Sequence, residues 1–325
     1  MPEYRVKKYT SRDRVLWEEF VRESNNGTIF HTQKFLSYHP EGRFKNHHLI
    51  ITKNDKPAAL ITGADREDDD GKRIFASYPG ASFGGFIFKK GASLEETKSV
   101  IEMSLEYMKE KKYDRFRVTL PCIFYCGAQN NNTEFIFSNL GFKYQKRELS
   151  SVSTLNFREE DVEKNFNSGC RRAVNKARKS GVEVKITSDY KQFYKILKKN
   201  LNLRHNVEPA HSESELIKLS EMFPEDIVFF GAYLGKKLLG GIVMFVCNKR
   251  VSMAFYISQD YKYQEYRPVN LLFSEVLRWS VQKGFSYLDF GLFTVNMDPN
   301  WGLCRFKESF GAQPVFREYF YLDLK

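Results

Sequence analysis

The residues in this sequence that are best suited to chemistry are cationic, and they gather in one segment. Residues 164–204 contain twelve Lys or Arg against two acids, Glu183 and Asp189, so the local net charge is +10. The whole chain has 51 Lys and Arg against 40 Asp and Glu, which gives a formal net charge of +11. Nearly all of the excess positive charge therefore lies in one eighth of the chain. A block of this kind favours a polyanionic partner.

The middle of this block predicts a short helix, which Asn167 or Ser168 can cap at its start. Arg171 and Arg172 lie near the helix N-terminus, where unpaired backbone N–H groups attract anions, and Lys176 lies on the opposite flank from Arg171. Acidic partners at i,i+4 that would neutralise the charge are missing. We expect these three side chains to bind phosphate, and the alternative is a solvated basic helix. The stripe expected to face the core contains Phe166, Cys170, Val174 and Ala177.

Composition limits the class of protein. A length of 325 residues favours two domains. Hydrophobic residues make up 42% and aromatic residues 15%, which excludes a disordered chain, a collagen and a small disulfide-stabilised protein. The five cysteines are odd in number and widely spread, which suits a reducing compartment. They lack the spacing of zinc ligands, so we expect no metal site.

The sequence also predicts a location for the protein. The N-terminus mixes charges throughout and lacks the apolar stretch of a signal peptide. The longest strongly apolar run, residues 238–247, is far too short to span a bilayer. We therefore expect no integral membrane segment and a cytoplasmic location.

The same pattern of strands and helices occurs twice along the chain. A strand, a polar turn and a second strand cover residues 47–67 and again 228–248, about 180 residues later. Each copy continues with a third strand, over residues 73–88 and 250–260, and then an amphipathic helix, over residues 94–112 and 268–283. A strand, a short helix ending in Gly and a final strand complete each copy. The order βββαβαβ thus predicts an internal duplication.

This duplication predicts the domain organisation and the fold class. The boundary is expected near residue 150, with domains over residues 1–150 and 151–325, and the last strand is able to pack across the domain boundary. A three-strand meander followed by a crossover helix and a further strand makes a mixed sheet. The GNAT acyltransferase fold has the same order. We therefore expect an α/β protein of two tandem GNAT-like domains.

Five motifs along the chain resemble the successive signatures of the FemABX family and its FemAB-like acyltransferase relatives. In chain order they are YPGASFGGFIF, RRAVNKARKSGVEV, LRHNVEP, YLDFGL and GLCRFKESFGAQP. The resemblance covers most of the chain. It implies tandem GNAT-like domains and the transfer of an amino acid from aminoacyl-tRNA to an amine of a peptidoglycan precursor.

The chain departs from this family at two places. The coiled-coil arm of some members is absent, because no heptad segment occurs in residues 205–325. Members often have Gly-Pro followed shortly by an acid, where this chain has Gly-Gly-Phe-Ile-Phe over residues 84–88. A catalytic role for that acid is therefore not carried over, and the acceptor stays open.

The resemblance implies roles for two basic residues. Arg204, in LRHNVEP, is expected to clamp the diphosphate of the acceptor through bidentate contacts. The alternative is a salt bridge from Arg204 to Glu208 or Glu213. Lys307, in FKESFG, is expected to steady the aminoacyl carbonyl or the tRNA terminus. The alternative for Lys307 is an exposed side chain on a short helix, with Phe306 and Phe310 at i,i+4 spacing as core anchors.

Further site residues come from the strands and helices of both halves. Asp289, in YLDFGL, can accept a proton from the amine if burial raises its pKa, or it can simply cap a loop or pair with a neighbouring Arg. Arg267 opens the crossover helix beside Pro268 and can contact a phosphate, although the glycine-rich turn of CoA-using enzymes is missing there. The expected catalytic residues are Lys307 and Asp289, and the expected substrate-binding residues are Arg204, Arg171, Arg172, Lys176, Tyr78, Tyr256, Phe306 and Arg267.

The chemistry expected of such a site is direct attack. Neither a Ser-His-Asp nor a Cys-His arrangement is visible, so we expect a ternary complex without a covalent intermediate. The leading hypothesis is an aminoacyltransferase that uses aminoacyl-tRNA and acts on a peptidoglycan precursor. The second is an acyl-CoA-dependent N-acyltransferase on another amine, and the third is a non-catalytic RNA-binding relative. No resident cofactor is expected, because aminoacyl-tRNA or acyl-CoA serves as co-substrate.

Overall fold

The computed structural model describes residues 3–205 and 208–325, apart from the side chains of residues 203–205. The chain divides into two compact units, which are Met1–Glu148 with Phe316–Lys325, and Leu149–Val315. They are called the first and the second unit below. Two long strands, β9 (Lys143–Thr154) and β17 (Gln313–Asp323), each contribute residues to both units.

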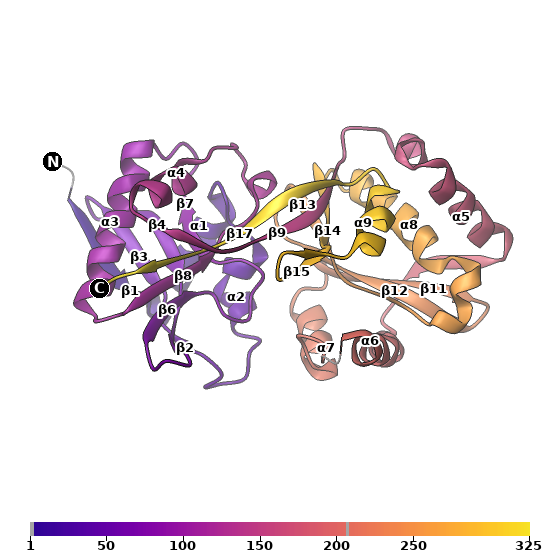
Figure 1. Cartoon of the computed structure of the whole chain (residues 1–325), viewed down its shortest axis with the longest axis horizontal. Coiled ribbons are helices and arrows are strands. Elements are labelled where there is room, and N and C mark those ends of the chain that lie inside the picture. The colour runs from indigo at the N-terminus through magenta and orange to yellow at the C-terminus, as the bar shows by residue number, and fades with distance from the viewer. Residues whose placement is uncertain (1–2, 206–207) are drawn as a thin grey trace. The chain divides into compact units, whose positions relative to one another are not determined.

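The strands of the first unit form two groups (Figure 1). The antiparallel group has the order β1-β3-β4-β7, with bounds Tyr4–Lys8, Leu49–Lys53, Lys56–Thr62 and Gly85–Phe88. The other group has the order β17-β8-β6-β5-β2, and its last four strands are Arg115–Thr119, Arg73–Ser77, Ala64–Glu67 and Lys45–Asn46. β6 and β8 are parallel, and α3 (Leu94–Glu110) lies between them in the chain.

The third strand expected in the first half is interrupted, so the prediction of one strand over residues 73–88 is wrong. β6 ends at Ser77 and pairs with β5 and β8, whereas β7 begins at Gly85 and pairs with β4. Between them, Pro79 has no N–H to donate to a ladder. Gly80 adopts a φ of +84° and Gly85 a φ of +89°, conformations that glycine takes without strain. The chain therefore leaves one strand partner and joins another.

The core of the first unit is rich in aromatic side chains. α3 buries Val100, Ile101, Leu105 and Met108, whose spacing places them on one face of the helix. They pack with the phenylalanines of the strands and of α4, which are Phe75, Phe86, Phe116 and Phe137. The other helical segments of this unit are η1 (Ser11–Asp13), α1 (Arg14–Glu23), η2 (Ile29–His31), α2 (Gln33–Leu36), η3 (Ile123–Tyr125) and α4 (Asn132–Asn139).

The second unit has one mixed sheet (Figure 1). Its order is β10-β11-β12-β13-β14-β9, and the first five strands are Val182–Ile186, Ile227–Leu234, Lys237–Val246, Val251–Gln259 and Tyr287–Leu292. β10 to β13 are antiparallel, and β14 is parallel to β13. The crossover helix α8 (Pro268–Gln282) connects these two parallel strands.

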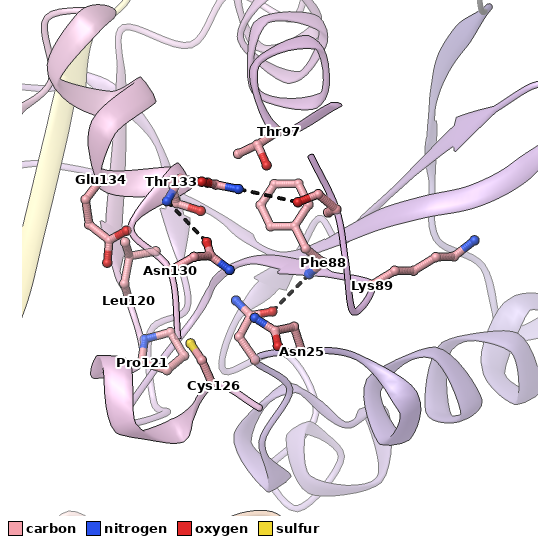
Figure 2. A pocket seen from close by; sticks show the side chains of 13 residues that line it. Asn25, Phe88, Lys89, Thr97, Leu120, Pro121, Cys126, Asn130, Thr133 and Glu134 are labelled. Carbon is pink, nitrogen blue, oxygen red and sulfur yellow. Dashed lines mark hydrogen bonds between the residues drawn. The ribbon is translucent and has the colours of Figure 1, made fainter. Parts of the chain in front are cut away.

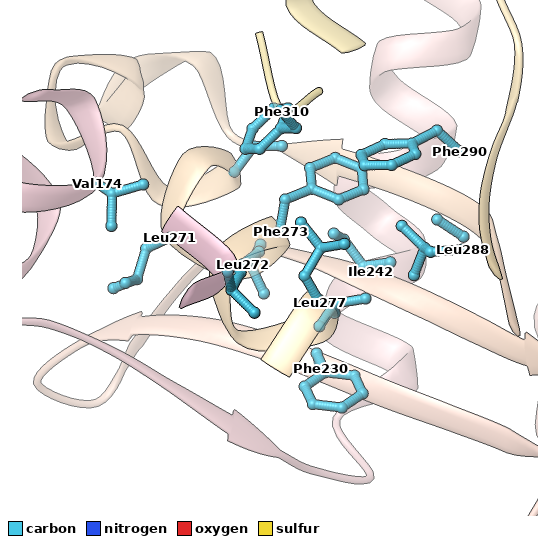
Figure 3. Packing of buried hydrophobic residues seen from close by; sticks show 14 of the residues in the cluster. Val174, Phe230, Ile242, Leu271, Leu272, Phe273, Leu277, Leu288, Phe290 and Phe310 are labelled. Carbon is cyan, nitrogen blue, oxygen red and sulfur yellow. The ribbon is translucent and has the colours of Figure 1, made fainter. Parts of the chain in front are cut away.

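The helices of the second unit enclose a second core. Figure 3 shows Phe273 and Leu277 of α8 beside Phe290 of β14 and Phe310, all of which are buried. The other helical segments are η4 (Glu159–Asn165), α5 (Ser168–Lys179), α6 (Tyr190–His205), α7 (Glu213–Met222), η5 (Tyr261–Tyr266) and α9 (Trp301–Glu308). A short hairpin of β15 (Thr294–Val295) and β16 (Asp298–Pro299) comes just before α9.

Both units thus have antiparallel strands, a crossover helix, a parallel strand, a short helix and a final strand, as the repeat predicts. None of the helices in the described part of the chain combines the length and the apolar character that crossing a lipid bilayer requires. No group of three His, Cys, Asp or Glu side chains suited to a metal ion occurs among the described residues.

Candidate active site

The two parallel strands of the second unit pair over a short distance only. β13 and β14 are in register from Val251 opposite Tyr287 to Met253 opposite Asp289. β14 then turns at Gly291, whose φ of +74° lies in the left-handed region that favours glycine. The backbone carbonyls that follow Asp289 are therefore not used by a β13–β14 ladder, and other groups bind them.

Lys307 of α9 binds these carbonyls. Its side chain is buried, with the residue 2% exposed, and Nζ donates to Gly291 O at 2.8 Å and to Leu292 O at 2.7 Å. Burying an ammonium group is costly unless polar groups replace its water, and the two carbonyl oxygens do this. The alternative of an exposed lysine on a short helix is thereby excluded.

Asp289 holds the same turn from the other side. It is fully buried, and its Oδ1 accepts from Ser150 Oγ at 2.6 Å and from Gly291 N at 2.7 Å. The bond to Gly291 N fixes the backbone whose carbonyl binds Lys307. Asp289 and Lys307, which lie 18 positions apart in the sequence, therefore meet at one turn. We refer to Ser150, Asp289, Gly291, Leu292 and Lys307 as the Lys307 cluster.

Aromatic packing fixes the helix that carries Lys307. Phe310 is fully buried, and its ring centroid lies 5.1 Å from that of Phe273 and 5.1 Å from that of Phe166. Phe306 is half-buried and packs edge-on against Phe310, with centroids 5.1 Å apart. Phe306 thus lies next to Lys307 in the sequence and anchors α9 to the core.

Tyr256 lies on β13, two residues beyond Ala254 of the α8-facing core. Its hydroxyl oxygen accepts from His211 N at 3.0 Å and lies 2.8 Å from His211 Nδ1. Burial raises the pKa of Tyr256, so the hydroxyl stays protonated. Sequence analysis missed His211, because it comes 45 positions before Tyr256 and belongs to no local motif. The pair ties the segment before α7 to the sheet.

The basic helix α5 begins as predicted. Asn167 accepts a hydrogen bond from Cys170 N at 2.8 Å and caps the helix. Arg171 donates through Nη1 to the carbonyl of Phe166, so it braces the residue before the cap. Arg172 and Lys176 are exposed, and within the described ranges no acidic side chain pairs with either of them. These two side chains are thus available to an anion.

Another arginine of α5 is used inside the fold. Arg178 donates to Glu163 at 2.6 Å and to Glu275 at 3.2 Å, and Arg278 of α8 donates to the same Glu163 at 3.0 Å. Burial alone would raise the pKa of Glu163, but the hydrogen bonds from Arg178, Arg278 and Ser274 lower it to about 2. This network fastens α5 and η4 to α8.

The other two arginines expected at the site, Arg267 and Arg204, lie at helix termini. Arg267 precedes α8 with a φ of +56°, and its side chain is exposed. Asn270 of α8 donates through Nδ2 to Cys170 Sγ of α5 at 3.7 Å, so the starts of α5 and α8 are neighbours. Arg204 falls in the last turn of α6, and its side chain lies outside the described residues.

Tyr78 belongs to the first unit, unlike the other expected site residues. It is buried, and its hydroxyl donates to Asn46 Oδ1 at 2.6 Å. Its ring lies 5.5 Å from the rings of His48 and of Phe44. These contacts place Tyr78 in an aromatic cluster of its own unit.

The first unit also has a small pocket of about 40 Å³ (Figure 2), at the starts of α3 and α4 and the ends of β7 and β8. Asn25 Oδ1 accepts from Ala128 N at 2.7 Å, and Asn26 Oδ1 accepts from Phe88 N at 2.9 Å, so these amides hold the surrounding loops. Burial raises the pKa of Glu134. None of the residues expected at the site lines this pocket.

The repeat allows the two units to be compared position by position. When the helix-ending glycines Gly141 and Gly311 are aligned, Phe137 corresponds to Lys307, and Phe137 is fully buried in the first core. Aligning the strands DRFRVTL and SYLDFGL places Arg117 at the position of Asp289. The first unit therefore lacks both polar members of the Lys307 cluster at the equivalent positions.

Comparison with known proteins adds a domain family for part of the chain and the fold of the whole. A sequence profile of the Acetyltransferase (GNAT) domain matches residues 164–308, which lie within the second unit. No curated protein matches the chain in sequence. The crystal structure of FemX shares 12% identity with this chain at a TM-score of 0.75, and the match covers 98% of this chain and 97% of that one.

Two other solved structures are similar in fold over almost the whole chain. The structure of L-PGS from Bacillus licheniformis has 13% identity and a TM-score of 0.61, and it covers 95% of this chain and 91% of its own. A tandem GNAT protein from the clavulanic acid biosynthesis pathway has 10% identity and a TM-score of 0.60, with 99% of each chain covered.

The profile and the fold agree with the resemblance that the five motifs carry. The matched residues 164–308 contain α5, the parallel strand pair and Lys307. The likeness to the tandem GNAT protein and to FemX extends through the first unit, which repeats the same order of elements. Residues 164–308 therefore form an acetyltransferase (GNAT) domain, and the chain as a whole has the fold of a tandem GNAT protein.

Proposed function

We propose that this chain is an aminoacyltransferase that moves an aminoacyl group from aminoacyl-tRNA to an amine of a peptidoglycan precursor. The observation that carries the proposal is the Lys307 cluster, in which a buried ammonium group is held on two backbone carbonyls where β13 and β14 separate. The FemAB-like motifs and the fold of FemX support this acceptor and this donor.

The reaction needs no covalent enzyme intermediate. The amine nitrogen of the acceptor attacks the ester carbonyl of the donor, a new C–N bond forms, and the bond from the carbonyl carbon to the ribose oxygen breaks. The proton lost by the amine ends on the ribose hydroxyl that leaves. The protein must hold both reactants together and stabilise the oxyanion that forms on the carbonyl oxygen.

Lys307 is the candidate for that stabilisation. The two carbonyls fix its Nζ at a defined place, and a fixed cationic donor stabilises developing negative charge without reorganising. Asp289 acts through Lys307, because it fixes Gly291 N with Oδ1 while Gly291 O binds Nζ. We therefore assign Asp289 as a positioning residue. This is the loop-capping role considered above, and it replaces the role of proton acceptor.

The cationic residues supply contacts to phosphate. Both proposed substrates carry phosphates, on the RNA backbone and on the diphosphate of the precursor. Arg172 and Arg267 are exposed at the neighbouring starts of α5 and α8, and Lys176 is exposed in the last turn of α5. Arg204 is assigned to the diphosphate on the strength of the LRHNVEP motif alone.

An acyl-CoA-dependent N-acyltransferase is the second candidate. The Acetyltransferase (GNAT) profile favours it. The turn before α8 speaks against it, because the residues Gln264, Glu265, Tyr266 and Arg267 contain no glycine to let backbone N–H groups approach a pyrophosphate. Retention of Lys307 and its carbonyl partners argues against a third candidate, the non-catalytic RNA-binding relative.

The test compares donors and variants in one assay. Charged tRNA and acetyl-CoA are each incubated with the protein and a UDP-linked muropeptide, and product is measured by mass spectrometry. We expect product with charged tRNA, and Lys307→Met should lower the rate about 100- to 1000-fold, as the loss of an oxyanion donor does. Lys236→Met, on an exposed turn between β11 and β12, is the matched control and should keep the rate.

Folding must be measured beside activity, because Lys307→Met also leaves two carbonyls without their donor, at about 1–3 kcal/mol of stability. Thermal unfolding of both variants separates the two effects. Product from acetyl-CoA with none from charged tRNA would refute the proposal in favour of the second candidate. Equal rates for folded Lys307→Met and the wild type would remove Lys307 from the chemistry.

A further inference from the structure

Three large apolar side chains are exposed in the segment of chain that runs from the turn of the Lys307 cluster into α9. Val295 is 64% exposed, Met297 57% and Trp301 63%, and they belong to the β15–β16 hairpin and to the first residue of α9. Asn296 and Met297 form the two-residue turn of the hairpin, with φ of +51° and +68°. A methionine in the left-handed region is strained by about 1 kcal/mol, and here it places an apolar side chain in solvent. Stability alone explains neither feature.

Two hydrogen bonds to neighbouring backbone carbonyls connect this exposed patch with Lys307. Nζ of Lys307 donates to the carbonyl of Leu292. The carbonyl of the following residue, Phe293, accepts from Asn300 N at 2.9 Å, and Trp301 comes directly after Asn300. Trp301 and Lys307 are also six residues apart on α9, which is about 9 Å along the helix axis. The two side chains also point about 120° apart around this axis, the indole being exposed and Lys307 buried, so a ligand that contacts both must span about one helix diameter, on the order of 10 Å, which is comparable with a nucleoside and its acyl group.

A cation accompanies the exposed indole on the same helix. Arg305 is exposed and lies four residues after Trp301, so both occupy one face of α9. Across the part of the chain that the structure describes, no acidic side chain forms an ion pair with Arg305. Glu308, one turn further, accepts from Cys304 Sγ at 3.3 Å. An exposed aromatic ring with an arginine beside it is the arrangement that binds single-stranded nucleic acid, through base stacking and phosphate contact.

We propose that Trp301 is the platform on which the terminal nucleobase of the aminoacyl-RNA donor stacks, with Arg305 beside the adjoining phosphate. The inference rests on the proposed function and names how the donor is recognised. In an aminoacyl-RNA, the reacting ester is on the same ribose that carries the terminal base, so base and carbonyl are one nucleoside apart. In acetyl-CoA the adenine is separated from the thioester by the whole pantetheine arm. The spacing of Trp301 and Lys307 therefore fits the RNA ester.

The probe for the test is an RNA hairpin with a single-stranded ACCA end whose last ribose carries an alanyl group through an amide, so that no transfer occurs. Binding to the full chain is measured by fluorescence anisotropy. Trp301→Ala should weaken binding roughly 5- to 150-fold, which is the effect of losing one stacked base. Trp301→Phe keeps a ring and should restore most of the affinity. Ile186→Ala removes a side chain that is 59% exposed on β10 of the same unit and should have no effect.

A second hairpin, in which the last nucleotide lacks its base, completes a double-mutant cycle. If Trp301 stacks on that base, removing the base and replacing Trp301 should not be additive, because each removes the same contact. Additive losses would overturn the inference. In the transfer assay, Trp301→Ala should raise KM for charged tRNA and leave kcat within about twofold, in contrast to Lys307→Met.

The outcomes separate the inference from the proposed function. If the wild type binds the hairpin and Trp301→Ala binds it equally well, the inference is wrong and the proposed function stands. If the wild type neither binds the hairpin nor uses charged tRNA, the proposed function fails and takes the inference with it. If Trp301→Ala loses binding to phosphatidylglycerol vesicles while it keeps hairpin binding, the patch contacts lipid and the inference is refuted.

Discussion

Replacing Glu163 with glutamine should remove a large acid-sensitive part of the stability of the second unit. Glu163 accepts from Arg178 at 2.6 Å, from Arg278 at 3.0 Å and from Ser274 at 2.8 Å, and so connects η4 with α5 and α8. Its side chain is 18% exposed, so solvent screens these interactions only in part. The basic helix α5 depends on this network for its position.

The size of the effect follows from the pKa of Glu163. Burial alone would raise it, but the hydrogen bonds lower it from the ordinary 4.5 to about 2. At about 1.36 kcal/mol for each pH unit, that difference corresponds to about 3 kcal/mol of folding free energy. Because the pKa is lower in the folded state, the contribution is complete above about pH 4.5. It is lost as the pH falls toward 2.

The assay is urea unfolding at pH 7 and at pH 2.5, followed by tryptophan fluorescence, to which Trp279 contributes from the second unit. This residue packs against Phe230 and Phe285 and therefore reports on the second unit. At pH 7 the variant should be less stable by up to about 3 kcal/mol, and at pH 2.5 the two proteins should unfold at nearly the same urea concentration. Glu160→Gln, which removes an exposed partner of Arg158, is the control and should behave as the wild type.

Two results would refute this reasoning. A difference between wild type and Glu163→Gln that stays the same at both pH values would show that ionisation of Glu163 does not contribute. The absence of any difference at pH 7 would show that the network contributes nothing to folding.

Gly291→Ala should cost about 1–2 kcal/mol of folding free energy, because a φ of +74° is strained for alanine, and it should lower kcat, because the carbonyl of residue 291 holds Lys307. Urea unfolding measures the first effect and the transfer assay the second. An unchanged kcat in the folded variant would contradict the prediction. A triple variant in which glutamine replaces Arg172, Lys176 and Lys179, the exposed lysine at the end of α5, should bind tRNA with a weaker salt dependence. The negative slope of log affinity against log salt concentration, measured by filter binding, should become shallower by about two to three. An unchanged slope would show that α5 does not meet the phosphates.

Local sequence rules predicted the parts of the fold that depend on neighbours in the chain. The cap at Asn167 and the buried stripe of Cys170, Val174 and Ala177 follow from helix geometry, and the structure confirms both. The two crossover helices were predicted within two residues of their observed ends, because the apolar period of 3.6 is strong in both. The duplication was visible since the order of elements survives in both halves.

Contacts between distant residues could not be predicted in this way. Arg178 has no acidic neighbour at i,i+4, yet Glu163 and Glu275 neutralise it from other elements. The hydrogen bonds between Tyr256 and His211 likewise depend on how the segment before α7 returns to the sheet. Propensity rules describe single elements, so they carry no information on such pairs.

The candidate site was predicted in part for the same reason. Lys307 and Asp289 were selected from motifs, but a lysine is normally exposed, and its burial depends on the turn at Gly291. Arg204 stays a prediction. Trp301 was not selected, although an aromatic residue four positions before an arginine on a short helix is a signal that could have drawn attention to it.

The two units differ at the positions of Lys307 and Asp289, where the first unit has Phe137 and Arg117. In the second unit the ammonium group of Lys307 is buried with two carbonyl partners, so replacing it with an apolar side chain leaves those carbonyls without their donor. The first unit has a fully buried phenylalanine at the position of Lys307, where another apolar side chain of similar volume can serve, and at the position of Asp289 it has Arg117, which lies 3.7 Å from Asp68 Oδ2. The two copies have therefore diverged: the second unit has the Lys307 cluster, and the first unit has a core phenylalanine at the position of the lysine.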